Sequence, residues 1–296
     1  MPPEYNHPAR VAERVATLDL VSNGRVDWGT GESASRAELE GFGVAPADKK
    51  AMWHEAVEQC ANMMAMTPYP GFDGEYFSMP CRNVVPKPVQ RPHPPIWVAC
   101  TRRETIEFAA RNGIGALTFA FADPDEAVKW VKDYYDIIKS DQCVPIGHTV
   151  NANIAMVTGF SCHDQAEEAK RRGMDGFRFF GYSLGHFYVY GHHVPGHTNI
   201  WERFEQARDT LPEAGAGSGI GTPGELSDHL GRFDEAGVDQ VIFIRQGGNN
   251  RHEHICESLE LFADKVMPPF KDREARRQGA KDADSGDPRL MNIGRR

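Results

Sequence analysis

The sequence predicts an α/β fold in which a parallel β-sheet is covered by helices. Between residues 95 and 270, short and continuous apolar segments alternate with longer amphipathic segments. Such apolar segments are typical of strands buried on both faces, and the amphipathic segments supply the crossover helices between them. We count five strands. That number is too small for a closed (β/α)8 barrel and suits an open doubly wound sheet, so spacing alone leaves the architecture open.

The N-terminal segment predicts one helix, one short strand and a second helix. The first helix follows His7, and its apolar residues recur at helical spacing: Val11, Val15, Leu18 and Val21. Asn23-Gly24 ends this helix, and residues 25–30 form a short strand. The second helix covers roughly residues 49–66. Residues 67–95 contain too many prolines for a helix, so we expect a long surface excursion there.

From residue 95 onward, strands and helices alternate regularly. The predicted strands are residues 95–100, 116–121 and 150–160, and the predicted helices are residues 104–113, 123–139 and 164–173. Asp123-Pro124 is a good helix start, since proline is favoured in the first turn. Residues 174–217 break this pattern. They are rich in aromatic residues, glycine and histidine, which indicates an insertion instead of a further sheet unit.

The alternation resumes at Thr222. This residue caps a helix with Pro223 in its first position, and Glu225 completes a capping box. A last strand (238–248) and a last helix (252–270) follow. We therefore expect one domain over residues 1–270. Residues 271–296 have no apolar period, which predicts a disordered or loosely attached tail.

The composition excludes several classes of protein. The chain has 33 Lys+Arg and 42 Asp+Glu, a net charge of −9, which argues against a nucleic-acid partner. No apolar segment approaches the ~20 residues of a membrane helix, and the N-terminus lacks the basic and apolar regions of a signal peptide. The six cysteines form no C-x-x-C pair. We therefore expect reduced thiols in a cytoplasmic protein.

A long motif near the N-terminus carries a family resemblance. Its residues are His7, Pro8, Arg10, Ala12, Glu13, Leu18, Asp19, Ser22, Gly24 and Arg25. This motif closely resembles one of the bacterial luciferase-like, flavin-dependent monooxygenases. The segments GEYFSM, PHPPIWVA and EFAARNG and the helix capped at Thr222 are similar to the same family. The resemblance extends from about Tyr5 to Phe270.

The resemblance implies a (β/α)8 TIM-barrel architecture carrying the aromatic and His-rich insertion. In the family the motif lies after barrel strand three and in strand four, so we expect this chain to lack the first three β/α units, about 90 residues. Either a start codon assigned too late or a natural fragment would explain this. Because the family builds part of the flavin pocket from that region, we expect the chain as written to bind flavin weakly and to self-associate through its open sheet edges.

The activity implied is that of a monooxygenase using O2 and reduced FMN, supplied by a separate flavin reductase, on a small organic substrate. A homo-oligomer is expected. One alternative is a coenzyme F420-dependent oxidoreductase on the same fold. Another is a truncated, non-catalytic barrel fragment that binds a ligand or a partner chain. The catalytic residues stay unknown, since no side chain stands out as an acid or base.

Two strand ends are candidate cofactor-binding sites. The turn at Thr30, Gly31 and Glu32 follows one strand, where barrel enzymes place ligands, although many family members have an arginine where this chain has Glu32. Thr101, Arg102 and Thr105 open a helix after the next strand, and helix N-termini with hydroxyl and guanidinium groups bind anions. The resemblance assigns the flavin phosphate to this second site.

Aromatic and histidine side chains supply the remaining candidates. Phe119 ends a strand and is a candidate for contact with the flavin ring, although a core position is the commoner role of such a residue. In the insertion, Tyr182, His186, Tyr188 and His193 are candidates for a substrate lid, because flavin chemistry with O2 must exclude water. His192, His193 and His197 lack acidic or cysteine partners at ligand spacing, and two ligands such as His252 and His254 rarely make a site, so we expect no metal site. The glycine-rich residues 215–221 follow no strand and predict a loop.

Overall fold

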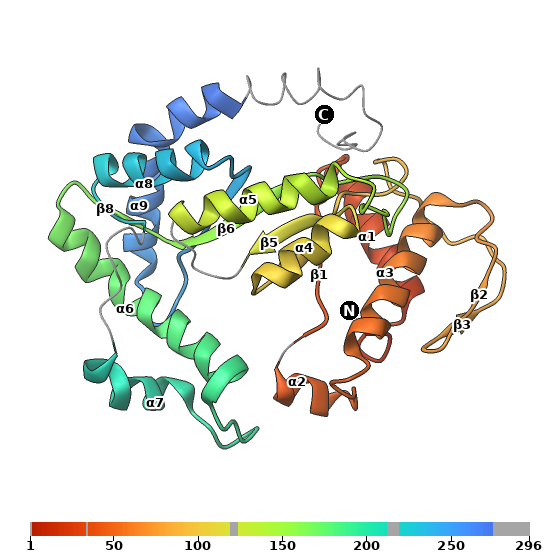
Figure 1. Ribbon diagram of the computed structural model, residues 1–296. Helices are drawn as coiled ribbons and strands as arrows, with labels where there is room; N and C mark the ends of the chain where they lie inside the picture. The colour runs from red at the N-terminus through yellow and green to blue at the C-terminus, as the bar shows by residue number, and fades with distance from the viewer. Residues whose placement is uncertain (1, 34, 119–123, 212–218, 275–296) are drawn as a thin grey trace. The chain divides into compact units, whose positions relative to one another are not determined.

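The computed structural model describes residues 2–33, 35–118, 124–211 and 219–274 (Figure 1). The chain forms two compact units. Among the described residues, the first unit contains those up to 118 and residues 132–154, and the second contains residues 124–131 and those from 155 onward. None of the described helices combines the length and the apolarity needed to cross a membrane.

The first unit begins with helix α1 (Pro8–Ser22), which packs against α3 (Lys49–Ala65). His7 caps α1, and Asn23 in the left-handed conformation ends the helix as predicted. The buried face differs from the prediction, because Leu18 and Val21 are exposed. Asp19 completes the buried face instead. The short helix α2 (Arg36–Gly41) was not predicted.

Three parallel strands form the sheet of the first unit, in the order β1 (Trp28–Thr30), β4 (Ile96–Cys100) and β5 (Gly115–Thr118). The register pairs Thr30 with Val98 and Cys100 with Thr118. Helix α4 (Arg103–Arg111) packs against β4 and β5. All three strands and α4 were predicted. Phe119 lies outside the described residues.

The proline-rich segment between α3 and β4 is only partly the surface excursion that was predicted. It carries a small antiparallel hairpin, β2 (Phe72–Asp73) and β3 (Ser78–Met79), yet Tyr69 and His93 are fully buried. Buried Asp19 accepts hydrogen bonds from the backbone N–H and the Nε2 of Gln90, both 2.8 Å long. Side-chain hydrogen bonds thus replace the regular backbone ladder that proline prevents.

The second unit contains the parallel strands β6 (Ile154–Gly159) and β9 (Gln240–Ile244), together with the short parallel pair β7 (Ser161–Cys162) and β8 (Ile220–Gly221). The longer strands β6 and β9 complete the five predicted from the sequence.

The core of the second unit packs around Phe160. The ring of Phe160 stacks on that of Phe243, with 4.4 Å between the ring centroids. Helices α8 (Pro223–Glu235) and α9 (His252–Lys265) contribute to this core. Thr222 and Glu225 form the predicted capping box of α8. Residues 267–274 are also helical, so the predicted tail begins within a helix, while residues 275–296 lie outside the described ranges.

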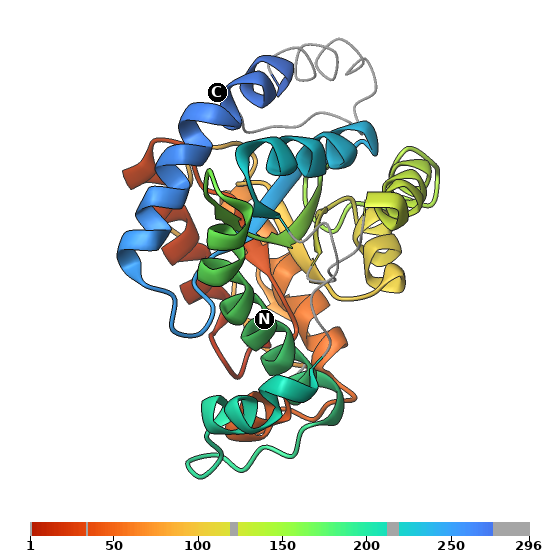
Figure 2. The ribbon, with the colours of Figure 1, turned by 90° about the vertical axis from the view of Figure 1, so that its left-hand side faces the viewer.

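The prediction that a helix ends at Gly173 is wrong. Helix α6 (Ala166–Gly185) continues for twelve residues beyond it and is followed by a π-helical segment, η1 (His186–Tyr190), and helix α7 (Ile200–Ala207). Figure 2 turns α6, drawn in green, toward the viewer. A Cβ on Gly173 would lie 2.4 Å from the Cβ of Ser161, and one on Gly176 would lie 2.4 Å from the carbonyl oxygen of Gly247. These glycines therefore permit close packing and do not end the helix. Helix α5 (Pro124–Ile138) has residues in both units.

Candidate functional site

The first candidate site lies at the carboxyl ends of the neighbouring strands β1 and β4. Parallel pairing brings Thr30 beside Val98, so both strands end at the same edge of the sheet. The Thr30 hydroxyl is buried and donates to the carbonyl oxygen of Trp97 at 2.7 Å. The proton of this hydroxyl is therefore already engaged in a hydrogen bond within the sheet. Gly31 follows at the edge, where the absence of a Cβ lets a ligand approach the backbone.

The turn after β1 contains a carboxylate that a lysine of α3 balances. Lys49 Nζ lies 3.7 Å from Glu32 Oε1 and donates to the carbonyl oxygen of Ser33 at 2.6 Å. Glu32 Oε2 is buried and has no hydrogen-bond partner among the described residues. The nearby ammonium offsets the repulsion that Glu32 would exert on an anion at this edge.

The start of α4 combines a helix N-terminus with an unpaired cation. The Thr105 hydroxyl accepts from the Arg102 N–H at 3.2 Å and donates to the Arg102 carbonyl at 2.6 Å. It therefore closes the first turn and is committed to the helix cap. The Arg102 side chain is exposed and forms no ion pair with a described residue, whereas neighbouring Arg103 pairs with Asp133 at 2.6 Å. Thr101 is exposed beside it. A free guanidinium at a helix N-terminus suits an oxyanion.

The candidate substrate residues lie in the second unit, at the end of α6 and beyond. His186 is 2% exposed, and its Nε2 lies 3.4 Å from Nδ1 of His193. The Tyr182 ring lies beside His186, with 6.5 Å between the centroids, whereas Tyr188 is 49% exposed. Burial lowers the pKa of His186, and the positive charge of Arg203 acts in the same direction. Both effects favour a neutral imidazole.

The sequence reasoning missed the buried charge of an arginine in the second unit. Arg245 directly follows β9 and is 8% exposed, yet its three guanidinium nitrogens have no hydrogen-bond partner among the described residues. An arginine that ends a run of strand residues in VIFIR was the available signal. No group of three or more His, Cys, Asp or Glu residues in the described ranges could hold a metal ion.

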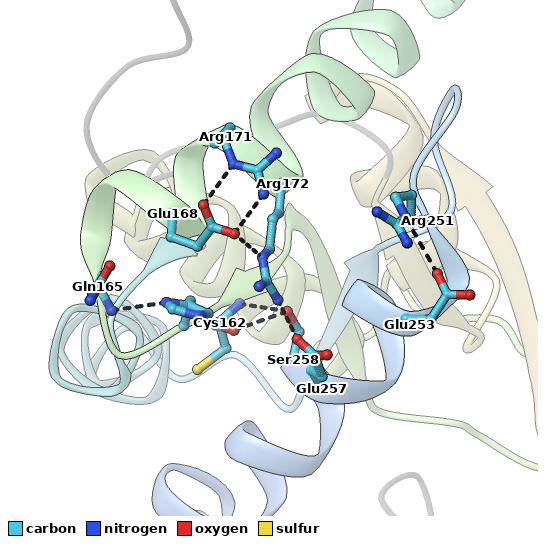
Figure 3. Close-up of polar contacts among 10 residues, drawn as sticks. Cys162, Gln165, Glu168, Arg171, Arg172, Arg251, Glu253, Glu257 and Ser258 are labelled. Atoms are coloured by element: carbon cyan, nitrogen blue, oxygen red, sulfur yellow. Dashed lines mark hydrogen bonds and ion pairs between the residues drawn. The ribbon is translucent and has the colours of Figure 1, made fainter.

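Polar contacts on α6 and α9 account for other charges of the second unit (Figure 3). Arg172 Nε donates to Glu168 Oε1 at 2.6 Å, and its Nη1 binds Glu257 of α9. These two carboxylates compensate a cation whose side chain is 12% exposed. Hydrogen bonds from Arg171 and then Arg172 lower the pKa of Glu168 to about 2.

Known proteins with similar sequences include two bacterial relatives. The chain is 28% identical over 210 residues to the uncharacterized protein y4wF of Sinorhizobium fredii, covering 68% of this chain and 57% of the relative. It is 26% identical over 282 residues to the oxygenase component of a flavin-dependent trigonelline monooxygenase of Acinetobacter baylyi, covering 93% of this chain and 76% of the relative. The chain thus spans 57% of the length of the first relative and 76% of the second.

Two solved structures share the fold. The monooxygenase RslO1 of Streptomyces bottropensis has a TM-score of 0.70 at 22% identity, with 91% of this chain and 76% of that chain covered. An F420-dependent secondary alcohol dehydrogenase, in complex with an F420-acetone adduct, has a TM-score of 0.64 at 18% identity, with 90% and 76% covered.

A family model described as luciferase-like monooxygenase matches residues 1–240. The matched range includes the motif after His7, the strand edge at Thr30 and Arg102, and strands β1 to β6. The resemblance noted from the sequence is thereby confirmed, and the chain belongs to the luciferase-like monooxygenase family.

Proposed function

We propose that this protein is the oxygenase component of a flavin-dependent monooxygenase, which uses O2 and reduced FMN from a separate reductase to oxygenate a small organic substrate. The observation that carries the proposal is the exposed Arg102 guanidinium at the N-terminus of α4, which forms no ion pair with a described residue and follows β4 at the edge where β1 also ends. The name of the Acinetobacter relative, an oxygenase component, supports a two-component system. The five parallel strands would belong to a barrel of the (β/α)8 type, as the resemblance implies.

The residues at the strand edge fit the phosphate of FMN. Arg102 would supply charge, and the first N–H groups of α4 and the Thr101 hydroxyl would supply hydrogen bonds. Thr105 would act through the turn that it closes around Arg102. Thr30, Gly31 and Glu32 would border the cofactor at the neighbouring strand, and Phe119 would contact its ring. Reduced FMN, when bound, supplies the electrons with which O2 is used.

Residues of the second unit would handle the substrate. Tyr182, His186, Tyr188 and His193 would form a largely aromatic cover that excludes water from the reaction. A neutral His186 can donate a hydrogen bond from Nε2 to Nδ1 of His193 or accept one there. His186 can therefore orient the ring of His193 without adding a charge of its own to the site.

The test of the phosphate assignment is an FMN titration of the full chain. Replacing Arg102→Glu should weaken FMN binding by about 1–3 kcal/mol, as for loss of a charge-assisted hydrogen bond. The control is Arg36→Glu, which reverses another exposed charge, on α2. Equal FMN affinities for Arg102→Glu, the control and the wild type would remove Arg102 from the site.

A second candidate function is coenzyme F420-dependent oxidation or reduction on the same fold. The F420-dependent alcohol dehydrogenase supports it, because its TM-score of 0.64 is close to the 0.70 of the monooxygenase. Parallel titrations with FMN and F420 separate the two functions. Binding of F420 without binding of FMN would replace the monooxygenase proposal by this one.

A further inference from the structure

Arg245 is a buried cation without an anionic partner in the described part of the chain. Its side chain follows β9, is 8% exposed, and leaves Nε, Nη1 and Nη2 unpartnered among the described residues. Arginine cannot relieve such burial by losing its proton at ordinary pH, because its pKa is too high. An uncompensated charge in this position destabilises the fold, and a bound anion would remove that penalty.

The neighbouring charges do not compensate Arg245. Burial lowers the pKa of Arg245, and the positive charge of Arg172 acts in the same direction. The carboxylates of Glu168 and Glu257 are turned to Arg172, as Figure 3 shows. Among the described residues, these two arginines in similarly buried positions therefore differ: Arg172 has two carboxylate partners and Arg245 has none.

The backbone around Arg245 is held in place. Asn250 Nδ2 donates to the Arg245 carbonyl oxygen at 2.8 Å, and Gly247 packs against Gly176 of α6 without room for a Cβ. Gly248 adopts a φ of 59°, and α9 begins four residues later at His252. The guanidinium thus lies where a strand passes through a glycine-containing loop into a helix. That is the end of a parallel strand at which α/β proteins bind ligands.

We propose that Arg245 binds an oxyanion, the carboxylate or phosphate group of a small ligand, at the carboxyl end of β9. The planar guanidinium presents two parallel N–H groups, which match two oxygens of either group. Arg245 belongs to a different unit from Arg102, and the proposal does not depend on FMN binding at α4.

Thermal unfolding of the full chain tests the proposal. Melting temperatures are measured in amine buffer at constant ionic strength, with sodium chloride replaced stepwise by inorganic phosphate in one series and by benzoate in another. For the wild type, we expect a saturable rise with at least one of the two anions, since a ligand that binds only the folded state stabilises it. The phosphate and benzoate series distinguish the two sources of the oxyanion.

Arg245→Met should abolish the saturable rise and should be at least as stable as the wild type without anions, because it removes an unpaired buried charge. Arg245→Lys keeps the charge without the paired N–H groups and should raise the apparent Kd about tenfold. If the methionine variant does not fold, the weaker anion binding expected of the lysine variant still tests the proposal. Arg172→Met is the matched control, which should lower the melting temperature yet keep the anion response.

An equal rise in the wild type and in either soluble Arg245 variant would overturn the proposal, as would the absence of a saturable rise in the wild type. FMN titrations keep this outcome separate from the function proposed above. Arg245→Met should bind FMN within twofold of the wild type, whereas Arg102→Glu should lose FMN affinity and retain the anion response.

Discussion

The carboxyl ends of β4 and β9 each place an arginine before a helix, but the two arginines differ in exposure. Arg102 is exposed, and Arg245 is 8% exposed. Water solvates Arg102 whether or not a ligand is bound, so the lack of an ion-pair partner costs little free energy. The role assigned to Arg102 therefore rests on the family resemblance. Water cannot solvate Arg245 in the same way, and its unpaired state has an energetic cost. A buried unpaired charge is therefore a stronger indication of a ligand than an exposed one.

His93 shows how a buried titratable group avoids this cost. It is fully buried, its Nδ1 lies 2.9 Å from the Pro94 carbonyl oxygen, and its Nε2 accepts from the His148 N–H at 3.0 Å. One ring nitrogen donates and the other accepts, which defines the neutral form. Burial lowers the pKa of His93 to about 4, and the hydrogen bond to Pro94 opposes this only in part. His93 can give up its proton, whereas Arg245 cannot.

The largest expected effect is on the pH dependence of stability through His93. Between pH 6.5, its ordinary pKa, and about 4, the unfolded chain binds a proton that the folded chain does not. The contribution of His93 to the free energy of unfolding should therefore be fully present above pH 6.5. This free energy should fall by up to about 3 kcal/mol as the pH decreases to 4. Urea unfolding at a series of pH values measures it. His93→Gln removes the titrating group and should flatten this part of the profile. Parallel wild-type and variant profiles would contradict the assignment.

The next effect separates the compensated arginine from the uncompensated one. Arg172→Met should destabilise the fold, because Glu257 loses its arginine partner and Glu168 keeps only Arg171. The loss should be smaller than for a fully buried pair, since the Glu257 side chain is 58% exposed. Chemical unfolding of Arg172→Met and Arg245→Met in anion-free buffer compares the two. If the two variants lost equal stability, the contrast between these arginines would be wrong.

The smallest expected effect concerns the loop that follows Arg245. Gly176→Ala should destabilise the protein by about 1–2 kcal/mol, because the new Cβ would lie 2.4 Å from the Gly247 carbonyl oxygen. Gly181→Ala, also within α6, meets nothing within 4 Å and should stabilise the helix by about 0.5–1 kcal/mol. Denaturant midpoints of the two variants should move in opposite directions. A shift of both midpoints in the same direction would show that the contact with Gly247 does not constrain α6.

The sequence predicted those features that local chemistry determines. The helix end at Asn23, the cap at Thr222 and the five parallel strands follow from residue order alone. The end of α6 was missed because Gly173 is read locally as a helix terminator, while its actual role depends on Ser161 of β7. Arg245 was missed for a related reason. Whether an arginine is solvated, paired or isolated is decided by residues distant in sequence, and no local pattern reports it.

The hydrogen bonds of the proline-rich segment have a consequence for protease sensitivity. A chain of this composition, without a long helix or strand, would ordinarily be a preferred cleavage site. Here Gln90 is attached to Asp19, and Lys87 Nζ donates to the carbonyl oxygens of Met63 and Met66, the last of which follows α3. Cleavage requires a segment to detach locally and enter the protease as an extended strand. The hydrogen bonds made by Lys87 and Gln90 oppose that detachment. A protease should therefore cleave residues 84–93 no faster than the segment separates from α1 and α3.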